Sequence, residues 1–219
     1  MDSYERYLKI KNSVPDDVEV IAVSKTRSIE EMDGAYKAGA RIFGENKVQE
    51  LIAKYDSFYK DVQWHLIGHL QRNKVKYLVG KVTLIQSLDS VSLLNEIEKQ
   101  FGKKGAIADT LIEINIGNEE SKTGILVEDL ESLLIEVEKC SHVKVKGLMT
   151  IIPKGDKENN RYYFKKVKEL YEKLQKKDFK NITMSTLSMG MSGDYDIAIS
   201  EGANMIRIGE GIFGKRNYK

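Results

Sequence analysis

A lysine follows an apolar run near the start of the chain, where its amine could act as a nucleophile. In VEVIAVSKTRS, residues 18–28, five of the six residues from Val18 to Val23 are apolar, and the run stops at Ser24 and Lys25. A neutral lysine amine attacks aldehydes to form Schiff bases. The solvated end of a strand explains the same pattern, so this stretch alone leaves both interpretations open.

An arginine near the end of the chain could share a cavity with Lys25. Arg207 lies between Ile206 and Ile208 in the run MIRIG. Successive strand residues face opposite sides, and a charge packed among apolar helices would be costly, so Arg207 should face the interior of the fold. A guanidinium beside Lys25 disfavours protonation of the amine and favours its reactive neutral form.

Glycine- and serine-rich segments follow the last two apolar runs. Backbone N–H groups at glycines and serine hydroxyls bind anions, and barrels often bind phosphate at this place. Tight turns before a helix capped by Ser192 or Asp194 explain the segments equally well. A phosphate site beside a reactive lysine and an arginine would suit a phosphorylated aldehyde, and pyridoxal 5′-phosphate (PLP) is the commonest such cofactor. The candidate anion-binding residues are Ser188, Gly190, Ser192 and Gly193 in SMGMSGD and Gly209 and Gly211 in RIGEG.

Eight short apolar runs, each followed by a segment with helical periodicity, must position these residues. The runs begin at residues 18, 41, 62, 82, 110, 144, 182 and 205, so each unit fits one strand and one helix. The pattern predicts a single (β/α)8 barrel domain over residues 1–219, with an extra helix around residues 3–13. An open doubly wound sheet is the competing fold, but SKTRS replaces the glycine-rich turn that such a sheet usually carries. Barrel closure would place the last strand beside the first, so that Arg207 and Lys25 face one cavity.

Composition and charge restrict the function classes. The formal net charge is +2 and the pI about 8.4, which gives no strong attraction to nucleic acid or membranes. The N-terminus lacks the apolar core of a signal peptide, and no run is long enough to span a bilayer, so we expect a soluble cytoplasmic protein. A single cysteine, Cys140, excludes an intrachain disulfide and a cysteine metal cluster.

Two histidines stand four residues apart, but we expect no metal site there. His65 and His69 belong to VQWHLIGH, which is typical of a strand. Four strand residues span roughly 13 Å, too far for both rings to hold one ion. We expect His65 to be hydrogen-bonded and to line the barrel mouth, and His69 to lie in the loop or to cap a helix starting near Gln71.

Seven motifs in order resemble the pyridoxal phosphate homeostasis protein family. They are AVSKT, FGENKVQE, WHLIGHLQRNK, NEESKTG, GLMTI, LSMGMSGD and IRIGEGIFGKR, and the resemblance extends over nearly the whole chain, from about residue 3 to 216. The resemblance implies a barrel like the N-terminal domain of alanine racemase, with PLP bound as an internal aldimine to Lys25. It also implies that Arg207 faces the ring nitrogen and that the cofactor is surrounded by Asn46, Ser188, Met189, Gly190, Ser192 and Gly209.

One residue departs from that family's pattern. After RIG the family commonly has Thr or Ser, which helps to bind the phosphate, whereas this chain has Glu210. A carboxylate beside a phosphate is repulsive. We therefore expect Glu210 to contribute only its backbone N–H, to turn its side chain away, and to weaken the affinity for the cofactor.

Three functions from different classes follow. The resemblance implies a PLP-binding protein of intracellular vitamin B6 homeostasis without robust turnover. We expect it to act as a monomer, with PLP-dependent apo-enzymes as candidate partners. The alternative is a weakly active amino-acid racemase, for which we expect the further domain that supplies a second acid–base group to be missing. A Schiff-base aldolase acting on phosphorylated sugars, with Lys154 as its lysine, is the third.

Overall fold

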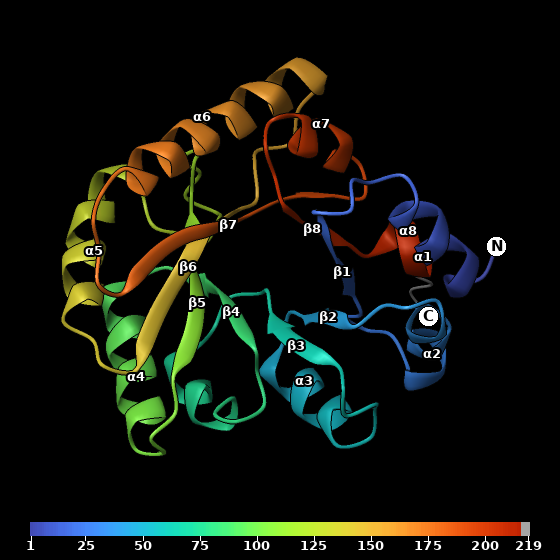
Figure 1. Ribbon diagram of the computed structural model, residues 1–219, viewed down its shortest axis with the longest axis horizontal. Coiled ribbons are helices and arrows are strands. Elements are labelled where there is room, and N and C mark those ends of the chain that lie inside the picture. Colours follow the sequence, from blue (N-terminus) through green and yellow to red (C-terminus); the bar gives the residue numbers. More distant parts are fainter. Residues whose placement is uncertain (216–219) are drawn as a thin grey trace.

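Eight parallel strands form a closed barrel in the computed structural model, which describes residues 1–215 (Figure 1). The strands follow one another around the barrel in chain order, and the last pairs with the first. This confirms the predicted barrel and excludes the open sheet, while the last four residues of the predicted domain 1–219 lie outside the described residues. The strands are β1 (Glu19–Val23), β2 (Ile42–Glu45), β3 (Gln63–Leu66), β4 (Leu84–Leu88), β5 (Ala108–Ile114), β6 (Val143–Thr150), β7 (Ile182–Met191) and β8 (Met205–Ile208).

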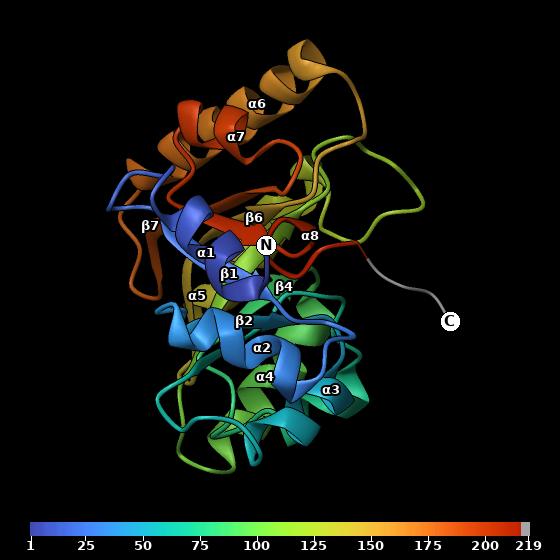
Figure 2. The same cartoon turned by 90° about the vertical axis from the view of Figure 1, so that its right-hand side faces the viewer.

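Helices surround the barrel and follow the strands in alternation. The predicted N-terminal helix is α1, which packs against α2 and α8 on one side of the barrel (Figure 2). The segment after β3 is a 3-10 helix, η1, that begins directly after Gln71. The helices are α1 (Ser3–Lys11), α2 (Ile29–Lys37), α3 (Val48–Tyr55), η1 (Arg72–Tyr77), α4 (Val91–Gly102), η2 (Val127–Asp129), α5 (Leu130–Glu138), α6 (Lys157–Gln175), α7 (Tyr195–Ser200) and α8 (Glu210–Phe213).

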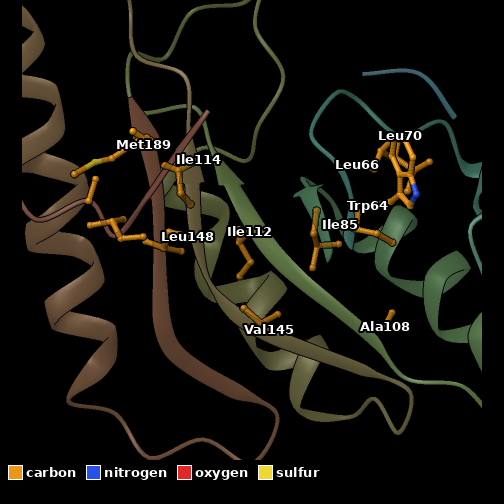
Figure 3. Packing of buried hydrophobic residues seen from close by; sticks show 14 of the residues in the cluster. Trp64, Leu66, Leu70, Ile85, Ala108, Ile112, Ile114, Val145, Leu148 and Met189 are labelled. Atoms are coloured by element: carbon orange, nitrogen blue, oxygen red, sulfur yellow. The ribbon is translucent and has the colours of Figure 1, made fainter. Parts of the chain in front are cut away.

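Alternating strand residues divide the core into an outer and an inner layer. The outer layer lies between strands and helices, and Figure 3 shows part of it around Trp64, Ile112 and Leu148. The inner layer fills the barrel and consists of Ile21, Val23, Ile67, Leu84, Leu111, Met149 and Met205. On β8, Ile206 and Ile208 belong to the outer layer, which confirms the predicted inward direction of Arg207 between them.

The pairing of β1 with β8 fixes the relative depth of the two candidate residues. Ile21 is the partner of Arg207 in the parallel register. Lys25 follows Ile21 by four residues and lies in the turn beyond the end of β1. Arg207 therefore lies deeper in the barrel than Lys25, although both belong to the same end.

A close backbone approach fixes the end of β2 against the end of β3. A Cβ atom added to Gly68 would lie 2.5 Å from the carbonyl oxygen and 2.8 Å from the Cα of Asn46. Backbone atoms cannot rotate away as a side chain does, so only glycine fits here without a shift of one strand end. Gly68 thus helps to place Asn46 at the barrel mouth.

Within the described residues 1–215, no helix is long and apolar enough to cross a membrane. The same part of the chain contains no group of three or more His, Cys, Asp or Glu side chains arranged to hold a metal ion.

We predict that Gly68→Ala lowers the free energy of unfolding by about 1–3 kcal/mol, because the added methyl group forces the ends of β2 and β3 apart. Gly193→Ala is the control, since a Cβ atom there meets nothing within 4 Å. Urea unfolding of both variants measures the effect. Equal stability of the two variants would show that the strand ends separate at no cost.

Candidate functional site

A cavity of about 430 Å³ opens at the carboxyl ends of the strands. Its volume falls within the range typical of small-molecule sites. A second cavity of about 550 Å³ adjoins it and shares Lys25, Gly209 and Glu210 with it. Seven residues that the sequence singled out for the cofactor or for an anion line the first cavity, namely Lys25, Asn46, Ser192, Gly193, Arg207, Gly209 and Glu210.

The floor of the cavity carries a buried arginine held by two hydrogen bonds. Nη1 of Arg207 donates to Oγ of Ser188 and Nη2 donates to the carbonyl oxygen of Thr150, each at 2.7 Å. Burial lowers the pKa of Arg207 to about 10, and the carboxylates of Glu113 and Asp194 act in the opposite direction. The guanidinium therefore stays charged at neutral pH.

A chain of hydrogen bonds continues from this arginine through the barrel. Oγ of Ser188 donates to Oε1 of Gln86 at 2.7 Å, and Nε2 of Gln86 lies 3.1 Å from Nδ1 of His65. Since the amide nitrogen of Gln86 can only donate, Nδ1 of His65 accepts and the ring proton is on Nε2. Burial lowers the pKa of His65 to about 3, so the ring is neutral.

A carboxyl group from β5 lines the wall of the cavity. Oε1 of Glu113 accepts a 2.7 Å hydrogen bond from Oγ1 of Thr123, and Oε2 is buried without a hydrogen-bond partner among the described residues. Burial raises the pKa of Glu113, and the Asp89 carboxylate raises it further, while Arg207 and His69 lower it. Glu113 thus holds a proton more readily than an exposed glutamate.

The loops after β7 and β8 are joined at the cavity edge. Oγ of Ser192 accepts a 3.0 Å hydrogen bond from the backbone N–H of Gly211. Asp194 precedes α7 at its N-cap position, but its carboxylate accepts from the N–H of Met191 at 2.6 Å and makes no cap bond to the helix. The Ser192 hydroxyl hydrogen is left to donate elsewhere, which suits an anion at this edge.

A comparison with protein families decides where the chain belongs. Residues 4–217 match the family model for the alanine racemase N-terminal domain. The chain is 45% identical to the pyridoxal phosphate homeostasis protein of Aquifex aeolicus, over 91% of this chain and 87% of that protein. It is 38% identical to the protein of the same name from Haemophilus influenzae, over 98% and 92%.

The chain belongs to the pyridoxal phosphate homeostasis protein family. Solved structures agree with this assignment. PipY of Synechococcus elongatus, in a structure described as having PLP bound, is 33% identical and superposes with a TM-score of 0.89, covering 97% of this chain and 100% of that one. An alanine racemase from Clostridium difficile, 16% identical with a TM-score of 0.78, covers 100% of this chain but 57% of its own length and supports the fold alone. The resemblance predicted from the motifs is thereby confirmed.

Four of the residues that we assigned to the cofactor from the sequence do not line the cavity. His65 and Ser188 are buried below the floor in the chain of hydrogen bonds that ends at Arg207. The prediction that His65 lines the mouth is therefore wrong, because the strand places its ring too deep. Met189 packs in the outer layer (Figure 3), and Gly190, with φ of 95°, lies against α7.

The cavity lining includes three polar side chains that the sequence did not assign to the cofactor. Glu113, Thr123 and His69 all line the cavity, and Nδ1 of His69 lies 3.1 Å from Oδ2 of Asp89. Glu113 shares its face of β5 with the inner-layer residue Leu111, so the strand parity contained the signal for it. Thr123 comes from the loop after β5. The sequence has no periodic pattern that would predict that this loop folds back to the barrel.

We predict that acid destabilises the protein through His65. The folded pKa of about 3 lies below the usual 6.5, so below pH 6.5 the unfolded chain takes up a proton that the folded chain does not. Stability should therefore fall with decreasing pH, by roughly 1.4 kcal/mol at pH 5.5 from this group alone. His65→Asn removes the titrating ring, and denaturant unfolding between pH 5 and 8 should give a shallower pH dependence for the variant. Parallel curves for both proteins would contradict the assignment.

Proposed function

We propose that this protein binds PLP through a reversible Schiff base on Lys25 and takes part in intracellular PLP homeostasis without robust turnover. The observation that carries the proposal is one cavity lined by Lys25, Arg207 and the Ser192–Gly209 edge. The PLP-bound state of PipY, at 33% identity over 97% of the chain, supports the same cofactor here. When bound, PLP would supply an aldehyde for the amine and an electron-withdrawing ring.

The residues of the cavity fit this cofactor in size and charge. A volume of about 430 Å³ suits a small phosphorylated ring. A Cβ atom added to Gly193 would meet nothing within 4 Å, so space remains at the edge where Ser192 is fixed by Gly211. Lys25 would attack the aldehyde carbon, with loss of water, while Asn46, Ser192 and Gly209 would orient the ring and the phosphate.

Low turnover follows from the roles proposed for the remaining residues. Arg207 would donate to the ring nitrogen, and a guanidinium does not pass on its proton at neutral pH. A ring nitrogen without a proton is a weaker electron sink, which slows most amino-acid chemistry of this cofactor. Glu210 is exposed beside the cavity, and its charge would oppose the phosphate if the carboxylate turned inward.

One observation favours the racemase alternative. Racemisation needs a second acid–base group across the cofactor from the lysine. In the chain order of the barrel, β5 is opposite β1, and Glu113 on β5 has a raised pKa and a buried oxygen without a hydrogen-bond partner in the described chain. Glu113 is thus the candidate for any residual activity. Action as a cytoplasmic monomer and supply of PLP to apo-enzymes stay predictions.

We predict that Lys25→Ala abolishes the visible absorbance that added PLP produces with the wild-type protein. Borohydride should fix the cofactor to a peptide containing Lys25 in the wild type and to no peptide in the variant. Lys154→Ala is the matched control, because Lys154 is the lysine of the aldolase alternative. Mass spectrometry after reduction measures both, and an adduct that survives Lys25→Ala would overturn the proposal.

We also predict that the PLP-loaded protein turns over alanine or serine well below the usual range for enzymes, about 1–10³ per second. Any residual racemisation should disappear in Glu113→Gln, because the amide cannot exchange the required proton. Circular dichroism of the amino acid over time is the measurement. Turnover inside the usual range would replace the homeostasis proposal with the racemase alternative.

A further inference from the structure

The turn that carries Lys25 has a strained backbone. The N–H of Arg27 donates to the carbonyl oxygen of Ser24 at 3.0 Å, which closes a four-residue turn with Lys25 second and Thr26 third. Thr26 has φ of 64°, in the left-handed region that glycine favours and branched side chains avoid. Such a conformation persists only where its surroundings hold it.

Side chains of α3 hold this turn from outside the barrel. Oε2 of Glu50 accepts from the backbone N–H of Thr26 at 2.7 Å, and Nζ of Lys54 donates to the carbonyl oxygen of Ser24 at 2.8 Å. Glu50 and Lys54 are four residues apart in α3, so both lie on the helix face toward the turn. The residues on either side of Lys25 are thus each bonded to the same helix.

The end of β2 completes this arrangement. Oε1 of Glu45 accepts from Nζ of Lys54 at 2.7 Å and from Oγ of Ser24 at 2.6 Å. The side chains of Glu45 and Lys54 are 0% and 11% exposed, so little water competes for these bonds. Hydrogen bonds to charged groups in such surroundings are the strong ones, and they fix the position of the turn.

We propose that Glu50 and Lys54 are positioning residues that hold the 24–27 turn, which we call the Lys25 turn, in its strained conformation and so aim the Lys25 amine into the cavity. This assigns a role to Glu50, the last residue of the motif FGENKVQE, whose Asn46 lines the cavity. The inference rests on the proposed function, because it concerns formation of the bond between Lys25 and the aldehyde.

The test compares two ligands that differ only at the reacting carbon. PLP carries the aldehyde, whereas 4-deoxypyridoxine 5′-phosphate carries a methyl group there and cannot bond to Lys25. Glu50→Ala should weaken PLP binding about tenfold or more, since a charge-assisted bond to the turn is lost. Binding of the deoxy analogue should change by less than about twofold, because the cavity itself stays intact.

A second substitution separates the orientation of the Lys25 amine from the general stability of the protein. Thr26→Gly removes the cost of the left-handed conformation, so Glu50→Ala with Thr26→Gly should recover most of the lost PLP affinity. Glu172→Ala is the matched control, because Glu172 pairs with Lys168 four residues earlier on α6. That control should bind both ligands as the wild type does.

Each outcome decides for or against the positioning role. Equal loss of PLP and analogue binding, or no loss of either, would overturn it, and so would the absence of rescue by Thr26→Gly. If Glu50→Ala does not fold, Glu50→Gln keeps an acceptor oxygen without the charge and should show the same selective loss at smaller size. A wild-type protein without a borohydride-fixed adduct on Lys25 would instead refute the proposed function.

Discussion

The charge of Arg207 inside the barrel is the constraint on which the rest of the site depends. A buried guanidinium without partners would cost several kcal/mol, so its N–H groups must be satisfied by the barrel itself. Ser188 and the Thr150 carbonyl meet this demand from β7 and β6. Because these acceptors are fixed in strands, the guanidinium has one position, and the cavity above it has a rigid polar floor.

The need to satisfy the Arg207 guanidinium also explains why His65, deeper in the barrel, is neutral. Ser188 can accept from Arg207 only by turning its own hydrogen toward Gln86, and the Gln86 amide then donates to His65. A protonated His65 ring would have no lone pair at Nδ1 and would set a second positive charge in the same apolar interior. The low pKa of His65 is thus part of how the barrel holds Arg207, and its deep position follows from that role.

Strand parity in the sequence predicted the faces of the strands but not the depth of their residues. The spacing of eight runs sufficed for the barrel, and Arg207 between two isoleucines sufficed for its inward direction. LSMGMSGD was harder, because the pairing of β7 with β8 shifts between Ser188 and Met191, where three steps on β7 oppose two on β8. Met189 faces the outer layer by simple alternation after the inward Ser188, whereas the irregularity brings Met191 in place of Gly190 to the cavity. Such a shift depends on the partner strand, so one strand's pattern cannot reveal it.

Charge balance at the mouth explains how a cavity with two glutamates can accept a phosphorylated ligand. Arg207 supplies a permanent positive charge below the ligand, whereas Lys25 becomes neutral if it forms an unprotonated Schiff base. With one positive charge left, an ionised glutamate beside the phosphate would be unfavourable. Burial raises the pKa of Glu113 and so reduces its negative charge, while Glu210 lies in water, where its charge is screened. An anion bound at the Ser192 edge would stabilise the protonated form of Glu113 still further, because two nearby negative charges favour protonation of the weaker acid. Ligand binding and proton uptake at Glu113 are then linked. The bound anion favours the protonated carboxyl group of Glu113, which is the candidate acid for catalysis.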